Sequence, residues 1–208
     1  RIVFASTRQI YGVPDYLPVD ERHLLHPTDV NGINKMAGEW YHILYNNVYG
    51  IKACSLRLTN TYGPRMRVKD ARQTFLGIWI RQIIEGKEIK VFGDGKQLRD
   101  FNFVDDVIEA LLLSAVSDEA YGNIFNLGSN DHVSLKDLAE LLIDINNGGD
   151  FSIVPFPPDR GKIDIGDYYG DFEKIRTQLG WEPTTSLREG LLRSLEFYKK
   201  YYSRYWSD

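Results

Sequence analysis

Asn31-Gly32-Ile33-Asn34-Lys35 lies at the start of the segment that decides the fold of this chain. From about Asp29 to Val48, apolar residues recur at intervals of three and four, which predicts an amphipathic helix that ends before Gly50. Residues 31 and 35 share one face of this helix. The apolar positions are Ile33, Met36, Trp40, Ile43, Leu44 and Val48.

Two apolar runs flank this helix. Residues 2–5 are typical of a strand buried on both faces, and residues 51–58 predict the next strand. The order strand, helix, strand is that of a parallel unit, so the sequence predicts an α/β fold.

The rest of the chain contains further predicted elements. An apolar helix follows the loop from Thr59 to Arg72, and Gly86 is placed to end it. The segments Ile89–Phe92 and Leu98–Val104 flank a Gly93-Asp94-Gly95 turn signal and predict a strand, a turn and a strand. Further helices are predicted near 105–117, 134–146, 172–179 and 187–205, two of them with the capping boxes Ser134-x-x-Asp137 and Ser186-x-x-Glu189.

The composition indicates a globular protein of one or two domains. The chain has 208 residues, of which 43% are hydrophobic, enough to bury a sizeable core. Its net charge of -4 and its lack of a long basic run argue against a nucleic-acid or membrane binder. No apolar stretch approaches the roughly 18 residues that cross a bilayer. The single cysteine, Cys54, lies in an apolar run, which fits a reducing compartment, by default the cytoplasm.

Polar residues follow the ends of the two predicted parallel strands. Ser6 and Thr7 come directly after the first strand, and Thr59 and Asn60 follow the second. Ligands of open parallel sheets bind beyond the carboxyl ends of the strands. The sequence therefore predicts a binding site at this edge of the sheet.

Arg99 lies within a later predicted strand and has two interpretations. It either pairs with a neighbouring acid, Asp100 or Asp105, or awaits an anionic ligand such as a diphosphate.

Four segments in this order resemble the extended short-chain dehydrogenase/reductase family of nucleotide-sugar epimerases, dehydratases and decarboxylases. They are residues 5–12, 31–35, 56–64 and 91–101, and the resemblance continues through Gly180-Trp181-Glu182-Pro183 to the final helix. It implies an NAD-dependent enzyme with a Rossmann-like parallel sheet and a smaller mixed α/β domain that binds a nucleotide-diphosphate sugar. Residues 1–58 would belong to the NAD-binding domain and 59–208 to the nucleotide-sugar-binding domain, with parts of 98–128 returning to the Rossmann sheet.

The resemblance implies catalytic and cofactor roles for residues near the two strand ends. Thr7 matches the catalytic Ser/Thr that holds the reacting hydroxyl of the sugar, and Ser6 lies beside it as a substrate contact. Lys35 matches the lysine that hydrogen-bonds the nicotinamide ribose and lowers the pKa of a catalytic tyrosine. Leu58 and Thr59 fall where the backbone lines the nicotinamide.

The resemblance also implies a binding path for the nucleotide sugar. Asn60 and Arg99 match groups that contact the diphosphate, and Arg160 resembles a second phosphate-binding arginine. The helix start near Thr74 matches a phosphate-facing N-terminus. The pair Val91-Phe92 matches the strand that holds the nucleobase.

The chain departs from the family pattern at the cofactor fingerprint. The Gly-rich stretch that cradles the pyrophosphate of the dinucleotide is absent from this sequence. The first predicted strand matches about the fifth strand of the family. We therefore expect the chain to be the C-terminal two-thirds of a longer enzyme, with an N-terminal Rossmann portion as its partner.

The second departure is Asn31, which stands where the family keeps its catalytic tyrosine. Its amide can hydrogen-bond a substrate hydroxyl but has no proton to exchange near neutral pH. Groups that could replace the tyrosine are Lys35, Thr7 through a water, and a nearby tyrosine such as Tyr11 or Tyr62.

Arg8 and Gln9 bear on the reaction. Family dehydratases carry an Asp-Glu pair here and decarboxylases typically a Glu, but neither Arg nor Gln delivers a proton as a carboxylic acid does. This disfavours dehydration and decarboxylation. Epimerisation remains, most often at C4 through a 4-keto intermediate as in UDP-glucose 4-epimerases, or ketone reduction. The alternative favoured by Asn31 is a nucleotide-sugar or NAD-binding protein without turnover.

Three remaining signals concern assembly and metal binding. The family often uses the helix over 29–48 for dimerisation, which implies a homodimer. His23 and His26 lie in a predicted loop without further metal ligands, so we expect solvated side chains and no metal site. The aromatic tail over 197–206 has helical spacing and predicts packing in a core or interface.

Overall fold

The computed structural model describes residues 1–69, 74–157 and 164–206. These residues form an α/β structure with a parallel sheet of three strands in the order β1-β2-β7. The α/β fold and the strands predicted at 2–5 and 51–58 are confirmed, and a third strand joins the sheet from much later in the chain. The strands are β1 (Ile2–Thr7), β2 (Ala53–Leu58) and β7 (Ile124–Asn126).

The helix α1 (Val30–Tyr49) connects β1 to β2, as predicted. The carboxylate of Asp29 caps its first turn by accepting a hydrogen bond from the Gly32 N–H at 2.7 Å. Gly50 ends the helix in the left-handed conformation, at φ 67°.

The apolar stripe predicted for α1 faces largely away from the sheet. On the sheet side, Gly32 lies against the backbone of Gln9, and the buried Glu39 pairs with Arg57 of β2. This polar pairing turns most of the stripe toward solvent, although Ile43 is buried. The half-exposed or more exposed members of the stripe are Ile33, Trp40, Leu44 and Val48.

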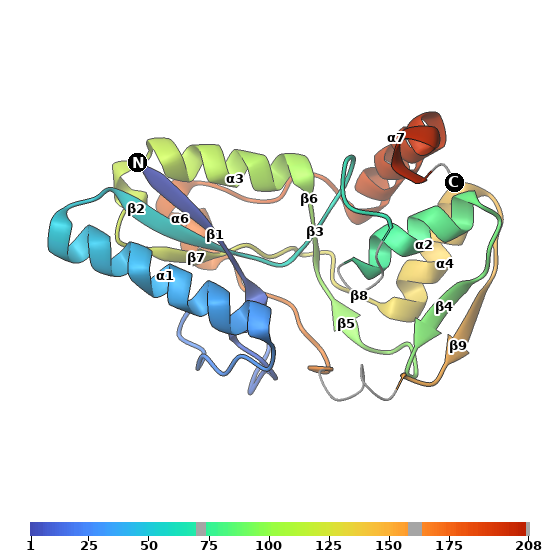
Figure 1. Cartoon of the computed structure of the whole chain (residues 1–208), viewed down its shortest axis with the longest axis horizontal. Coiled ribbons are helices and arrows are strands. Elements are labelled where there is room, and N and C mark those ends of the chain that lie inside the picture. Colours follow the sequence, from blue (N-terminus) through green and yellow to red (C-terminus); the bar gives the residue numbers. More distant parts are fainter. Residues whose placement is uncertain (70–73, 158–163, 207–208) are drawn as a thin grey trace.

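Helices lie on both sides of the sheet. Figure 1 shows α1 and α3 running along opposite sides of the three strands. On the α3 side, Leu56 and Phe125 of the sheet pack with Val107 and Trp181 in one buried cluster. The helices on this side are α3 (Val104–Val116) and the short α6 (Glu173–Leu179).

A second hydrophobic core lies among the remaining helices, at the other end of the molecule in Figure 1. It contains Trp79 and Ile80 of α2, Leu138 of α4 and Leu191 of α7, which pack beside the paired strands β4 and β9. The predicted helices are confirmed. These elements are α2 (Phe75–Ile84), α4 (Leu135–Asn146), α7 (Leu187–Trp206), β4 (Ile89–Phe92) and β9 (Phe151–Val154).

Aromatic residues of the C-terminal tail pack on one another and on the core. The buried Tyr198 contacts Phe197, Tyr205 and Trp206, and its hydroxyl donates to the Met66 carbonyl at 2.7 Å. The tail is therefore a packing element, as its helical spacing predicts.

The strands around the Gly93-Asp94-Gly95 turn do not pair with each other. β4 pairs in parallel with β9, β5 pairs antiparallel with β8, and β6 pairs in parallel with β3. The predicted strand at 89–92 is confirmed, whereas the single strand predicted over 98–104 is divided into β5 and β6, which have different partners. The short strands are β3 (Asn60–Tyr62), β5 (Leu98–Arg99), β6 (Phe101–Phe103) and β8 (Val133–Ser134).

Both predicted capping boxes form their backbone bond. Ser134 Oγ accepts from the Asp137 N–H at 3.0 Å, and Ser186 Oγ accepts from the Glu189 N–H at 3.3 Å. Among the described residues, no helix is both long enough and apolar enough to cross a membrane.

Candidate active site

The parallel register of β1 and β2 brings the predicted strand-end residues together. Thr7 ends β1 directly opposite Leu58, which ends β2, and Ser6 lies opposite Arg57. Thr59 follows Leu58 immediately, so the predicted reaction and nicotinamide residues share one edge of the sheet. This is the edge where ligands of open parallel sheets bind.

Lys35 reaches this edge from α1. Its ammonium donates to the backbone carbonyl of Ala5 at 2.6 Å and lies 5.1 Å from the centre of the Phe4 ring. Within the described part of the chain, the buried hydroxyl of Ser6 has no hydrogen-bond partner. A buried hydroxyl without a hydrogen-bond partner normally destabilises the folded protein. The Ser6 hydroxyl is therefore suited to a hydrogen bond with a ligand group at this position.

Gln9 links Thr7 to Asn31. The Thr7 hydroxyl lies 3.4 Å from Gln9 Oε1 and accepts from the Gln9 backbone N–H at 3.3 Å. The Asn31 side chain donates to the same Gln9 oxygen, and Gln9 Nε2 donates to Asp29 Oδ2 at 2.7 Å. Asn31 is therefore linked to Thr7 through the side-chain amide of Gln9.

The amide chain fixes which group Asn31 can offer to a ligand. Its Nδ2 donates to Gln9, so its Oδ1 remains as an acceptor for a hydroxyl hydrogen. An amide in this role orients a hydroxyl without taking up its proton.

Two tyrosines considered as replacement bases are unsuited to proton transfer. The fully buried Tyr11 hydroxyl donates to Asn126 Oδ1 and accepts from Arg57 Nη1, both at 2.6 Å. Tyr62 is buried and donates to the Leu187 carbonyl at 3.3 Å. Burial raises the pKa of both phenols far above the ordinary value of a tyrosine. Lys35 and Thr7 remain as candidates.

Asp100 connects the predicted nicotinamide residue to the predicted diphosphate residues. Its carboxylate accepts from the Thr59 hydroxyl and from the Gly170 N–H at 3.0 Å, and its carbonyl accepts from Asn60 Nδ2 at 2.8 Å. Burial raises the pKa of its carboxyl to about 6, although the hydrogen bonds from Thr59 and Gly170 and the charge of Arg8 act in the opposite direction.

Arg99 is paired with an acid rather than left open for a ligand, but its partner, Asp164, is distant in sequence. Its Nη1 donates to the carbonyls of Leu98 and Gly166, at 2.8 and 2.5 Å, and its Nη2 lies 3.4 Å from Asp164. Burial lowers the pKa of its guanidinium to about 10, and the positive charge of Arg8 acts in the same direction. The expected partner Asp105 instead pairs with Arg193.

The other predicted nucleotide-sugar contacts belong to a different part of the molecule. Thr74 precedes α2, and its hydroxyl donates to the Arg67 carbonyl at 2.5 Å rather than capping the helix. Val91 is fully buried and Phe92 stacks on Phe156, with ring centres 6.3 Å apart. Figure 1 shows α2 and β4 apart from β1 and α1. Arg160 lies outside the described residues.

The expectation of two solvated histidines is wrong for His23 and correct for His26. The His23 ring is buried, accepts from the Asp15 N–H at 2.8 Å and lies edge-on to Tyr11. Its other nitrogen lies 2.8 Å from the Leu24 carbonyl. His26 is exposed. The loop folds back on Tyr11, which local sequence does not reveal.

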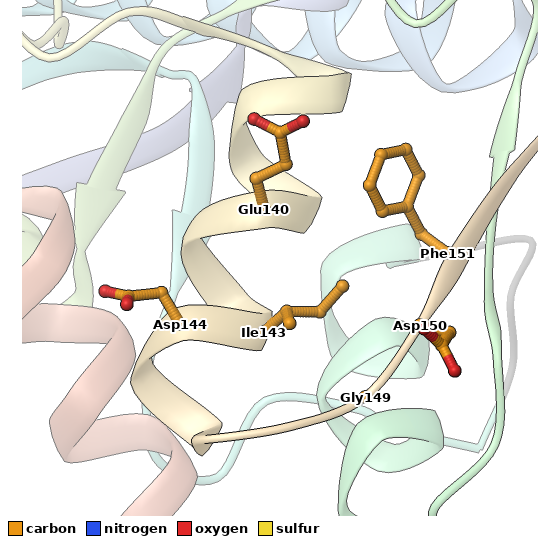
Figure 2. Close-up of a pocket in the computed structure, with 6 residues that line it drawn as sticks. All are labelled: Glu140, Ile143, Asp144, Gly149, Asp150 and Phe151. Carbon is orange, nitrogen blue, oxygen red and sulfur yellow. The ribbon is translucent and has the colours of Figure 1, made fainter.

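A pocket of about 460 Å³ lies between α4 and the start of β9. Figure 2 shows Ile143 pointing from the helix toward Asp150 and Phe151, Glu140 on the same helix, and Asp144 pointing away from them. Its carboxylates disfavour an anionic nucleotide, and none of the predicted site residues lines it. Among the described residues, no group of three or more His, Cys, Asp or Glu could hold a metal ion.

Sequence reasoning missed three residues that connect the site. Asp29 accepts from Gln9 and caps α1, and an aspartate next to the start of a helix is the signal that could have indicated this cap. Asp100 is expected only as a partner of Arg99, whereas its carboxylate accepts from the Thr59 hydroxyl. Tyr168, which lies under Arg8, carries no local signal because it is far from Arg8 in the sequence.

A comparison with family models matches residues 1–128 to the NAD dependent epimerase/dehydratase family. Among curated proteins, the chain is 35% identical over 201 residues to a Methanocaldococcus jannaschii protein provisionally named UDP-glucose 4-epimerase. The match covers 96% of this chain and 63% of that protein. The chain thus spans less than two thirds of the length of this relative.

Solved structures match with the same coverage. UDP-glucose 4-epimerase of Thermotoga maritima, solved with UDP-glucose, has 33% identity and a TM-score of 0.87 over 96% of this chain and 63% of its own. UDP-glucuronic acid 4-epimerase of Bacillus cereus, solved with UDP-glucuronic acid and NAD, has 29% identity and a TM-score of 0.85 over 96% and 62%. The neighbours share the Rossmann-like α/β fold.

Proposed function

The chain belongs to the NAD-dependent epimerase/dehydratase family, and from this premise we propose that its protein epimerises a nucleotide sugar at C4 through a 4-keto intermediate. The observation that carries the proposal is the convergence of Thr7, Asn31 and Lys35 on the carboxyl end of β1. Thr59 and Asn60 both hydrogen-bond Asp100, and Thr59 directly follows the end of β2.

The described residues fit the nicotinamide end of NAD. The Lys35 ammonium is available beside β1 for a ribose hydroxyl, and the unpartnered Ser6 hydroxyl lies in the same strand. Leu58 and Thr59 would line the ring from the end of β2. NAD, when bound, supplies the hydride acceptor for oxidation at C4. We propose that the pyrophosphate cradle comes from a part of the protein outside these 208 residues.

The reaction class rests on Arg8 and Gln9. Dehydration and decarboxylation in this family use carboxylic acids at these positions, according to the resemblance drawn from the sequence. Gln9 is a neutral amide engaged by Asn31 and Asp29, so it provides no proton. Epimerisation needs only removal and return of a hydride and a hydroxyl proton at one carbon, and Thr7 would hold that hydroxyl.

One observation supports a second candidate. The Asn31 amide has no proton to give near neutral pH, and Tyr11 and Tyr62 are locked in buried hydrogen bonds. A nucleotide-sugar or NAD-binding protein without turnover is consistent with that arrangement, and so is a ketoreductase in which Lys35 supplies the proton.

Domain roles and cellular setting remain part of the proposal. We assign residues 1–58 to the cofactor domain and 59–208 to the nucleotide-sugar domain, with β7 completing the cofactor sheet. The buried thiol of Cys54 suits a reducing compartment such as the cytoplasm. The exposed apolar face of α1 suits a homodimer.

The test is turnover by the full-length protein that contains these residues. It would be incubated with NAD and with uracil-, guanine- and thymine-linked sugars, and C4 stereochemistry would be read by NMR. Interconversion of a C4 epimer pair supports the proposal, and Lys35→Ala should reduce it at least about 100-fold. Lys52→Ala, at an exposed lysine, is the control.

The outcomes separate the candidates. Binding of NAD and sugar nucleotides without conversion would favour the binding protein. Consumption of reduced cofactor with a keto sugar would favour the ketoreductase. Full epimerase activity in Lys35→Ala would contradict the assigned site.

A further inference from the structure

Arg8 occupies an unusual place in the proposed site. It follows Thr7 directly, and its guanidinium carbon lies 4.8 Å from the centre of the buried Tyr168 ring. A contact with an aromatic face holds a cation in place but leaves its charge and its hydrogen-bond donors available.

The groups around Arg8 are already engaged with other partners. Asp100 is fully buried, and its two carboxylate oxygens accept from Thr59 and Gly170. Arg99 uses its two terminal nitrogens on backbone carbonyls and on Asp164. Arg8 differs from Arg99 in this respect, because the contact described for its guanidinium is with an aromatic ring rather than with an oxygen atom.

The positive charge of Arg8 affects the pKa of Arg99. It is the second cause, after burial, of the lowered pKa of the Arg99 guanidinium. Like charges repel each other in a poorly solvated setting, so an anion bound at Arg8 would offset this repulsion.

The position of Arg8 indicates which anion would fit. Thr7 would hold the reacting hydroxyl, and Arg8 follows Thr7 directly, so Arg8 would lie within reach of the sugar ring. A guanidinium offers two parallel donors that match the two oxygens of a carboxylate. A neutral hexose has no charged group that could pair with the Arg8 guanidinium.

We propose that Arg8 binds a carboxylate on the sugar, so that the substrate is a nucleotide-linked uronic acid. This inference rests on the proposed function and narrows its substrate class. Arg8 then acts as a specificity-determining residue that favours acidic over neutral sugars.

The test compares binding of acidic and neutral sugars to the full-length protein loaded with NAD. Calorimetric titrations would use UDP-glucuronate with UDP-glucose, GDP-mannuronate with GDP-mannose, and the free nucleoside diphosphates. The variants are Arg8→Gln, which removes the charge, and Arg8→Lys, which keeps the charge but not the paired donors. Arg188→Gln, at an exposed ion pair with Asp144, is the matched control.

The expected result is a selective loss. Arg8→Gln should weaken the uronate about 10- to 100-fold, the range for a hydrogen bond to a charged group, and leave the neutral sugar within about threefold. Arg8→Lys should recover part of the uronate affinity. The wild-type protein should bind the uronate more tightly than the neutral sugar that carries the same nucleobase.

Two results would overturn the inference. An equal loss for uronate, neutral sugar and free nucleoside diphosphate would assign Arg8 to the diphosphate. No change in any affinity would assign Arg8 to packing on Tyr168. If the wild-type protein binds none of the sugar nucleotides, the proposed function fails rather than the role of Arg8 within it.

Discussion

The side-chain amide of Asn31 donates a hydrogen bond to the side-chain oxygen of Gln9, joining α1 to the turn that follows β1. Because the Thr7 hydroxyl contacts the same oxygen, one neutral group connects the two ends of the proposed reaction site. The arrangement orients a hydroxyl well but provides no proton carrier between Thr7 and Lys35.

Restoring a phenol at position 31 tests whether proton transfer limits the reaction. Asn31→Tyr should raise turnover about 100-fold or more, since general acid–base catalysis contributes on that scale. The measurement is the C4 epimerisation rate of the full-length protein at saturating sugar nucleotide. Asn34→Tyr, at an exposed position of the same helix, should leave the rate unchanged. A flat or lower rate for Asn31→Tyr would show that another group carries the proton.

The parts of the site that are local in sequence were predictable. Asn31 and Lys35 lie on one helix, and Thr7 and Leu58 end neighbouring strands, so helical periodicity and the parallel rule place them together. Gly50 ends α1 as predicted, and Asp29, which is predicted as the start of the helix, is its N-cap.

The parts that depend on distant partners were not predictable from pattern alone. β4 pairs with β9, which is distant in sequence, and no residue near β4 predicts that pairing. Arg99 pairs with Asp164 rather than with an adjacent acid, and His23 is buried under a loop that folds onto Tyr11. Tertiary packing decides these contacts between distant residues, and the periodicity of apolar residues in the sequence carries no information about them.

The buried ion pair between Glu39 and Arg57 should matter more for stability than any surface pair. Arg57 Nη2 lies 2.5 Å from Glu39 Oε1, and the two side chains are 3% and 0% exposed. Arg57→Ala leaves a buried carboxylate without its counter-charge, so the free energy of unfolding should fall by about 3–5 kcal/mol. Urea unfolding of wild type and variant measures the difference.

An exposed pair provides the matched control for that measurement. Arg188 lies 2.6 Å from Asp144, with both side chains more than half exposed. Arg188→Ala should change the free energy of unfolding by at most about 1 kcal/mol. Equal effects of Arg57→Ala and Arg188→Ala would contradict the role assigned to the buried pair.

The outward face of α1 should hold two copies of the protein together. Tyr41, Leu44 and Val48 are each at least 50% exposed on this helix. Leu44→Asp places a charge in the centre of that face, so a dimer should dissociate to monomers, measured by light scattering across a concentration series. Leu24→Asp, at a residue that is 73% exposed outside the helix, should leave the assembly unchanged. A wild-type monomer at all concentrations would refute the dimer.

Asp100 should make the stability of the protein fall as the pH rises through its titration. Its pKa is raised by burial from 3.8 to about 6, so the folded protein retains a proton that the unfolded chain releases. The stabilising protonated form is fully present below about pH 3.8 and is lost as the pH passes 6. The contribution between these limits is roughly 3 kcal/mol.

Asp100→Asn isolates this contribution because the amide stays neutral at every pH. The amide of the variant has one acceptor oxygen where the carboxylate has two, so one of the bonds from Thr59 and Gly170 is lost at a fixed cost in stability, but the variant should not share the pH-dependent loss. Urea unfolding at pH 4, 5, 6 and 7 should therefore show the wild type losing stability relative to Asp100→Asn over this range. Asp94→Asn, at an exposed residue, should keep the wild-type profile. Parallel profiles for wild type and Asp100→Asn would mean that the carboxyl titrates alike in the folded and unfolded protein.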